Sequence, residues 1–237
     1  MQHNLNRQQD RVRLFESGLR FVGQLEGLKQ EPMLAGVVCG SRLPEGWAQG
    51  RDTVDFFDVK GDVEQLLAPR VVTFVADEHP AMHPGRCAAV VVDDQPIGHV
   101  GEFHPRWRQA YDLPSAPIVF ELDLAAVQAR EVPQAQALPR QQAARRDLAL
   151  VVQEHVKHDA LTAALRDDES GLVRSATLFD VYRPKAGAAD FAEGERSLAV
   201  RLELLSDDAT LTDEIIDAAV ASAIARATAA CGARLRA

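Results

Sequence analysis

Hydrophobic positions in the C-terminal part of the chain recur with two periods. Alternating apolar residues in four segments predict short strands, and apolar residues three and four positions apart predict two helices. The strands are expected at 147–152, 175–182, 197–204 and 233–236, and the helices at 159–166 and from 213 onward. Thr212 is the expected N-cap and Gly232 the expected end of the second helix. The order β-α-β-β-α-β is that of a ferredoxin-like domain. The apolar stripe of the second helix is expected to comprise Ile215, Ile216, Ala219, Val220, Ala223, Ile224 and Ala227.

The N-terminal half has a different pattern, in which strands dominate. Strands are expected at 11–21, 34–39, 71–76, 87–92, 97–100 and 118–124, with a loop at 40–52 and a hairpin turn at 93–96. Within 55–67 the apolar residues fall on one helical face, formed by Phe56, Val59, Val63, Leu66 and Leu67. The pattern predicts an antiparallel sheet with helices, so the whole chain is expected to be α+β.

Between 127 and 144 the chain is rich in Gln, Ala, Arg and Pro and loses its periodicity, which is typical of a connector. We therefore expect a first domain at 1–127, a linker at 128–144 and a second domain at 145–237. With 237 residues, of which 46% are hydrophobic, the chain is long enough for two domains with buried cores.

The charge balance limits how the protein could hold a nucleic acid. Acidic residues outnumber basic ones by nine, which argues against binding through bulk positive charge. Any RNA contact must therefore be local. The three cysteines, Cys39, Cys87 and Cys231, are far apart and form no C-x-x-C pair, so they are interpreted as reduced packing residues. Since no apolar run has the length of a signal peptide core or membrane span, the expected compartment is the cytoplasm.

Strand parity separates the two faces of the C-terminal sheet. A ferredoxin-like sheet has helices on one face, and alternation leaves the other side chains on the open face. Parity puts Thr177, Phe179 and Val181 on the core side and Leu178, Asp180 and Tyr182 on the open side. The open face should also carry Ser197, Ala199, Arg201, Glu203, Arg234 and Arg236. Such a mixture of an aromatic ring, hydrogen-bonding groups and guanidinium groups suits single-stranded RNA. An ordinary solvated sheet face remains the alternative.

Seven ordered blocks resemble one protein family. They are VDFFDVKGDV at 54–63, HPAMHPG at 79–85, GEFHP at 101–105, RRDLALVV at 145–152, LFDVYR at 178–183, SLAVRL at 197–202 and TLTDE at 210–214. Together they resemble the C-terminal part of the bacterial phenylalanyl-tRNA synthetase β subunit. The resemblance implies part of a class II synthetase-like domain without catalytic activity, followed by a ferredoxin-like anticodon-binding domain. Because that subunit is far longer, we expect a C-terminal fragment whose first domain is truncated at its N-terminus.

The resemblance also implies roles for particular residues. Asp180, Tyr182 and Ser197 match positions that contact the anticodon, and Ala149 matches a position where a base lies against the sheet. A basic group that could meet phosphates, or simply be solvated, comprises Arg140, Arg145, Arg146, Arg183 and Lys185, and Arg201 joins it from the open face. This chain departs from the family at Gln141-Gln142, where the family has Phe-Pro, and in the longer, more acidic loop at 184–195. Both departures bear on how an anticodon would approach.

The whole enzyme that the resemblance implies is an α2β2 heterotetramer that joins phenylalanine to its tRNA with ATP and Mg²⁺. Its active site belongs to the α subunit, so this chain is expected to pack against α, to bind the anticodon and to catalyse nothing alone. Arg13 lies where class II synthetases carry the strand whose Arg binds ATP phosphates, but no later Gly-rich segment supplies the matching Arg. The alternative is an interaction module without an RNA role, which the net negative charge favours.

Two other kinds of site have candidate residues in the sequence. His79, His83, Glu102 and His104 could suggest a metal site, but their spacing is not that of common structural sites, and the proline after each His favours ordered turns. Asp55, Asp58 and Asp62 are too widely spaced for a compact Mg²⁺ cage and are interpreted as a solvated helix edge. No motif for a catalytic nucleophile is found. We expect no metal in this chain.

Overall fold

The computed structural model describes residues 1–9, 11–130, 132, 134–135, 138–167, 170–185 and 190–236. The chain divides into two compact units, Met1–Pro133 and Gln134–Ala237. Each unit has its own sheet and its own hydrophobic core, and each is described by itself. Parts of the predicted linker (131, 133 and 136–137) and of the predicted long loop (186–189) lie outside the described residues.

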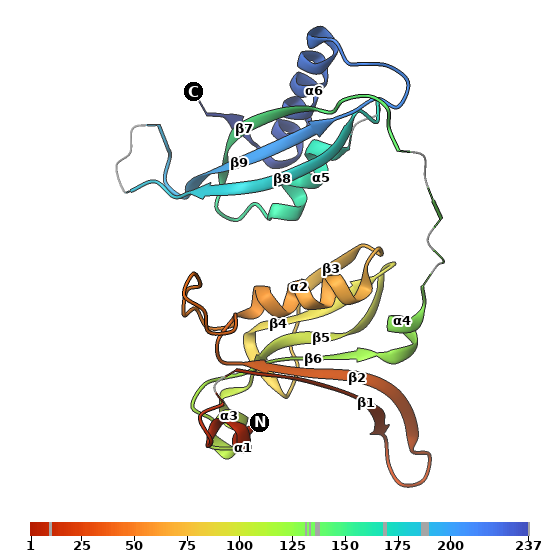
Figure 1. The fold of residues 1–237 in the computed structure, drawn as a ribbon, viewed down its shortest axis with the longest axis vertical. Helices are drawn as coiled ribbons and strands as arrows, with labels where there is room; N and C mark the ends of the chain where they lie inside the picture. The colour runs from red at the N-terminus through yellow and green to blue at the C-terminus, as the bar shows by residue number, and fades with distance from the viewer. Residues whose placement is uncertain are drawn as a thin grey trace. The chain divides into compact units, whose positions relative to one another are not determined.

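The first unit is built on a six-stranded antiparallel sheet with the order β1-β2-β6-β5-β4-β3 (Figure 1). Its strands are β1 (Val12–Val22), β2 (Lys29–Cys39), β3 (Val72–Ala76), β4 (Met82–Val92), β5 (Gln95–Phe103) and β6 (Ile118–Asp123). Several are longer than alternation alone predicts. The turn between β4 and β5 has Asp93 and Asp94 at positive φ, 50° and 60°, as a tight two-residue hairpin requires.

In the part of the first unit that the structure describes, four helices accompany this sheet: α1 (Gln2–Leu5), α2 (Phe56–Leu67), α3 (Pro105–Ala110) and α4 (Leu124–Gln128). The predicted helix at 55–67 is confirmed as α2, and Asp55 caps it by accepting hydrogen bonds from the backbone N–H groups of Phe57 and Asp58. Val59, Val63 and Leu67 are buried against the sheet with Val90, Val100 and Leu122. Leu124, predicted to end a strand, instead opens α4 because the Asp123 carboxylate caps the helix there.

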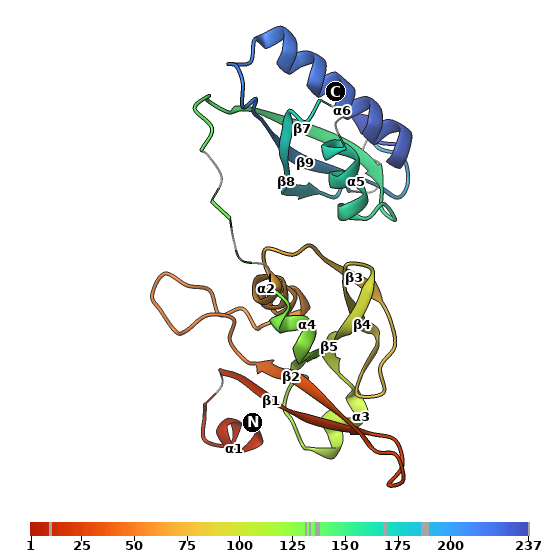
Figure 2. The same ribbon diagram turned by 90° about the vertical axis from the view of Figure 1, so that its right-hand side faces the viewer.

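The second unit has the predicted ferredoxin-like order, with β7 (Ala144–Gln153), α5 (His158–Arg166), β8 (Val173–Tyr182), β9 (Glu195–Leu204), α6 (Asp213–Cys231) and β10 (Arg234–Leu235). The sheet order is β10-β7-β9-β8 and all pairs are antiparallel. Figure 2 shows α5 and α6 on one side of this sheet, which leaves the other side free of helices. The core lies between helices and sheet and includes Leu150, Val200, Leu202, Leu161 and Ala223.

Helix α6 begins and ends as predicted. Thr212 accepts a hydrogen bond from the backbone N–H of Ile215, and Gly232 adopts the left-handed conformation, with φ of 62°, that favours glycine at a helix end. One member of the predicted apolar stripe differs, because Ile215 is exposed, whereas Ile216, Ala219, Ala223 and Ala227 are buried. Among the described residues, no helix is both long and apolar enough to cross a membrane.

A β-bulge in β8 changes the predicted distribution of side chains. Leu178 is opposite Val200 of β9, but Asp180 is opposite Ala199, so Phe179 is an extra residue in the ladder. Alternation therefore restarts at this point. Leu178 packs toward the core and not on the open face, where it was predicted. Thr177, which was predicted on the core side, is exposed opposite Arg201. The prediction that Phe179 faces the core is wrong.

Candidate nucleic-acid interface

The open face of the second unit has a floor of small side chains at its centre. Ala149 of β7 is opposite Ala199 of β9, and Ala199 is opposite Asp180 of β8. Both alanines are partly exposed, and the carboxylate of Asp180 is exposed beside them. Asp180 is held locally, since one of its oxygens accepts a hydrogen bond from the backbone N–H of Val181 at 2.9 Å. The floor is thus flat and has a hydrogen-bond acceptor at one edge.

On one side of this floor lies a phenylalanine with a guanidinium group over it. Phe179 is 53% exposed, and the guanidinium carbon of Arg201 lies 5.2 Å from the centre of its ring. Asp147 holds Arg201 at both Nε and Nη2, each at 2.8 Å from a carboxylate oxygen. This bidentate pair lowers the pKa of the Asp147 carboxyl and raises the pKa of Arg201.

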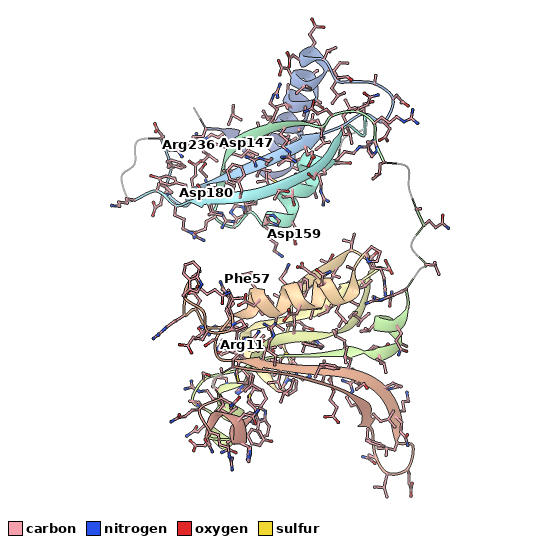
Figure 3. The ribbon with its side chains drawn as sticks, viewed as in Figure 1. Arg11, Phe57, Asp147, Asp159, Asp180 and Arg236 are labelled. Carbon is pink, nitrogen blue, oxygen red and sulfur yellow. The ribbon has the colours of Figure 1, made fainter. Side chains whose placement is uncertain are left out.

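On the other side lies a second aromatic group, made of Tyr182, Phe191 and Arg236. The rings of Tyr182 and Phe191 are 5.8 Å apart, and the guanidinium carbon of Arg236 lies 4.9 Å from the Tyr182 ring centre and 5.3 Å from that of Phe191. Figure 3 labels Asp147, Asp180 and Arg236, which come from β7, β8 and the segment after β10. Among the described residues Arg236 has no carboxylate partner, so its charge is available to a ligand.

Ser197 differs from its predicted state. It has open-face parity, opposite Val151 and Tyr182, but it is only 3% exposed. Val151, on the same face, is 1% exposed. Tyr182, which is opposite Ser197 in the ladder, contacts Phe191 and Arg236 at this end of the face. Ser197 therefore lies beneath the surface that a ligand would meet first.

The predicted basic residues do not form one cluster. On the open face, Arg145 lies 3.6 Å from Glu203. Arg146 has the opposite parity and pairs with Asp213 at the start of α6, so it lies on the helix-bearing side. Arg183 is 3.8 Å from Glu154, with both side chains largely exposed. Because exposed ion pairs of this kind contribute little, these residues remain free to exchange a carboxylate for another anion.

Other charges at the edge of the face are fixed more firmly. Arg234 donates to a Glu195 carboxylate oxygen at 2.7 Å and to the Asp190 carbonyl at 2.7 Å. The Arg234 hydrogen bond, followed by the backbone N–H of Ala192, lowers the pKa of Glu195. These contacts join the end of the predicted long loop to β10. The exposed residues Arg140 and Lys185 have no ion pair among the described residues.

Three histidines of the first unit, His79, His99 and His104, make local contacts, whereas the buried Nδ1 of His83 has no hydrogen-bond partner among the described residues. The ring of His79 accepts a hydrogen bond from the backbone N–H of Ala81, and the ring of His104 caps α3 by accepting from Arg106 N–H. His99 lies 2.9 Å from the Asp77 carboxylate, which is the main reason that the pKa of Asp77 is lowered. No group of three metal-ligating side chains occurs within the part of the chain that the structure describes.

Arg13 is also committed elsewhere. Its guanidinium group forms an ion pair with Asp62 of α2. A phosphate would have to displace that carboxylate. The strand that carries Arg13 instead presents apolar side chains, since Phe15 is 80% exposed and Leu14 is 49% exposed. Both line an apolar pocket of about 570 Å³ together with Val37, Met82 and Phe103.

Sequence reasoning missed two contributors to the open face, Phe179 and Phe191, and the contacts of a third, Arg236. Phe179 was assigned to the wrong side because nothing in LFDVY marks a bulge. Phe191 lies in the loop that departs from the family pattern, and its contact with Tyr182 depends on how that loop returns to β9. Arg236 was placed on the open face by parity, but its position over two rings is a tertiary contact. The sequence feature that could have indicated an aromatic open face is the presence of two aromatic residues, Phe179 and Tyr182, close to Asp180.

Comparisons with known proteins give consistent results for both units. Residues 1–124 match the family described as phenylalanyl tRNA synthetase beta chain CLM domain. Residues 139–236 match the family described as ferredoxin-fold anticodon binding domain. Among curated relatives, the phenylalanine–tRNA ligase beta subunit of Pseudomonas fluorescens (strain Pf0-1) is 50% identical over 92% of this chain and 27% of its own length. The subunit of the same name from Ralstonia nicotianae is 43% identical over 100% of this chain and 31% of its own length. The chain thus spans less than a third of these relatives.

Proposed function

This chain belongs to the family of phenylalanyl-tRNA synthetase β chains, and from that premise we propose that its second unit binds the anticodon loop of the tRNA for phenylalanine. The ligand surface is the open face of the sheet. Ala149 and Ala199 provide a floor for a base, Asp180 accepts hydrogen bonds from a base edge, and Tyr182 provides a ring on which a base stacks.

The observation that supports this proposal most strongly is the combination of small and aromatic side chains on the open face. A sheet face that is only solvated needs neither exposed rings nor a flat alanine floor between them. Here Phe179 and Tyr182 are both about half-exposed, and each has a guanidinium group over its ring. Ser197 supports this surface from below, while Arg236, Arg145 and Arg183 are the charges that can meet phosphates.

The acidic net charge is compatible with this assignment. The proposed contacts are local stacking and edge recognition, which do not need a large basic patch. Arg146 is left out of the proposed interface because it lies on the helix-bearing side of the sheet. Arg201 is retained, but in a role other than neutralising a phosphate, because Asp147 already neutralises it.

Filling the alanine floor tests the proposal. Ala149→Leu adds bulk where a base would lie and should weaken binding of the anticodon stem-loop at least tenfold, because about 1.4 kcal/mol of lost stacking suffices for that factor. The matched control is Ala160→Leu, at an exposed position of α5 on the helix-bearing side. Fluorescence anisotropy with labelled stem-loop RNA gives both affinities. Equal affinities for the two variants would contradict an RNA site on the open face.

We propose further that the first unit packs against the catalytic α subunit in an α2β2 assembly. This role is supported by the exposed apolar side chains of the β1–β2 hairpin, including Leu14, Phe15 and Phe21, because large apolar patches mark interaction surfaces. Phe15→Asp should reduce co-purification with co-expressed α subunit. Retained co-purification would contradict packing through this hairpin.

The whole assembly would charge tRNA with phenylalanine in the cytoplasm, using ATP and Mg²⁺. No step of that reaction is assigned to this chain. The ion pair between Arg13 and Asp62 does not fit an ATP-phosphate site on β1, since the arginine is already engaged. The proposed division of labour is therefore catalysis by α, with anticodon binding and architecture supplied by this chain. The limits 1–127, 128–144 and 145–237 remain our proposal for its domains.

A further inference from the structure

We propose that Phe179 and Arg201 form a second base-stacking position on the open face, separate from the position at Tyr182. The inference rests on the proposed RNA-binding function. It adds that the open face holds two bases at two separate positions. It assigns to Phe179 a direct contact with RNA and to Arg201 a stacking role. Neither follows from strand alternation.

The bulge in β8 is what creates this position. Because Phe179 is the extra residue between the pairs Leu178–Val200 and Asp180–Ala199, its ring and the Asp180 carboxylate lie on the same face. The ring remains 53% exposed despite the guanidinium group over it. An exposed aromatic ring beside an exposed hydrogen-bond acceptor is the arrangement with which sheet platforms stack a base and read its edge.

The guanidinium group of Arg201 has a fixed orientation, and its charge is paired with a carboxylate. Asp147 binds both Nε and Nη2 at 2.8 Å, which sets the orientation of the guanidinium group and neutralises it. A neutralised arginine adds little to phosphate binding, whereas its flat surface still stacks on rings and bases. Phe179 and Arg201 together therefore present a pre-oriented stacking surface.

The two stacking positions are too far apart to hold one stacked pair of bases. Tyr182 is opposite Ser197, and Phe179 lies between the residues opposite Val200 and Ala199, so the two rings are two to three residues apart along β9. At about 3.3 Å per residue this is roughly 7–10 Å. Neighbouring stacked bases are only about 3.4 Å apart. The bound bases must therefore be splayed, and the floor of Ala149 and Ala199 lies between them. An RNA loop with unstacked bases fits this spacing.

A fluorescent base placed at one anticodon position at a time tests the inference. Stem-loop RNAs carrying 2-aminopurine at each anticodon position are titrated with the full 237-residue chain, and stacking quenches the fluorescence. We expect Tyr182→Ala to restore fluorescence at one position and Phe179→Ala to restore it at a different one. Each change should weaken binding about tenfold.

Two further variants separate stacking from other roles. Phe179→Leu keeps an apolar side chain but removes the ring, so it should behave as Phe179→Ala does and remain decisive if the alanine variant fails to fold. Arg201→Lys keeps the charge but removes the plane, so it should also weaken binding. Wild-type affinity of Arg201→Lys would overturn the stacking role of the guanidinium group.

The outcomes distinguish this inference from the proposed function. If the unmodified chain does not bind the stem-loop, the proposed function fails, and the second position fails with it. If the chain binds, and Tyr182→Ala releases one base while both Phe179 variants leave affinity and every fluorescent position unchanged, only the second position is wrong. Release of the same base by the Tyr182 and Phe179 variants would also overturn it.

Discussion

Arginines at the residue scale show how the open face can bind RNA without a strong positive field. Arg201, Arg145 and Arg234 each have a carboxylate partner on or beside the face, whereas Arg236 lies over two aromatic rings. Pairing cancels long-range charge, and for Arg201 and Arg234 hydrogen bonds to the carboxylate also fix the orientation of the guanidinium group. Specificity would then come from stacking and hydrogen bonds, which agrees with the acidic composition of the whole chain.

The pKa of Asp147 tests the Arg201 pair. Arg201 lowers the pKa of the folded carboxyl relative to the unfolded chain. The pair therefore stabilises the fold above the unfolded pKa, and this contribution is lost as pH falls through the lower folded pKa. Carboxyl ¹³C shifts should show the pKa of Asp147 rising toward the ordinary range in Arg201→Ala. Asp77, whose pKa is lowered by His99, is the control and should not change. An unchanged Asp147 would contradict the pair.

Phe179 tests the face assignment through stability. The strand alternation predicted a buried ring whose truncation would cost about 3–5 kcal/mol. Because the ring is half-exposed, we expect Phe179→Ala to lower the free energy of unfolding by about 1 kcal/mol or less. Leu202→Ala, at a fully buried position of β9, should cost about 2–5 kcal/mol. Urea unfolding measures both. A large loss for Phe179→Ala would restore the original face assignment.

At the scale of elements, the sequence was sufficient to predict the order and type of the helices and strands, but not the local register in which strands pair. Periodicity identified α2, α5, α6 and the strands β7, β8 and β9, because each buries side chains on one face, whereas both residues of β10 are exposed. The bulge in β8 was not predicted, because it adds one residue to the strand without a glycine or proline to mark it. Ser197 had the right parity, but strand alternation does not predict whether a side chain on the open face is covered, and Ser197 is only 3% exposed.

The N-cap of α6 is an element-scale feature that can be tested alone. The Thr212 side chain accepts a hydrogen bond from Ile215 N–H, which satisfies a donor that the helix cannot pair internally. We expect Thr212→Ala to lower the free energy of unfolding by about 1 kcal/mol, and Thr212→Ser to retain most of it. Chemical denaturation of the two variants gives the comparison. Equal losses for both would show that the hydroxyl does not act as the cap.

At the scale of the whole molecule, family resemblance contributed what periodicity could not. The seven sequence blocks implied a β-subunit family and an anticodon-binding unit, and both are confirmed by the matched families. The pairing of Arg13 with Asp62 and the apolar surface of the β1–β2 hairpin depend on how distant segments meet, so they had to come from the structure. They support an architectural first unit rather than a catalytic one.

Catalysis by the chain alone can be tested directly. Supplied with ATP, Mg²⁺, phenylalanine and its tRNA, the purified chain should form neither aminoacyl-adenylate nor aminoacyl-tRNA, because the one arginine in the ATP-strand position is held by a carboxylate. Phenylalanine-dependent pyrophosphate exchange is the measurement. Sustained exchange that purifies with the chain would refute the assignment of catalysis to another subunit.

The central claim is that RNA binds the helix-free face of the second unit. An amide NMR titration of the ¹⁵N-labelled chain with the anticodon stem-loop tests it most directly. We predict the largest shift changes at Ala149, Phe179, Asp180 and Ala199, with small changes at Ala160 on α5 and at Phe57 on α2 of the first unit. Shift changes concentrated on α5 and α6 or on the first unit, or no changes at all, would contradict the account.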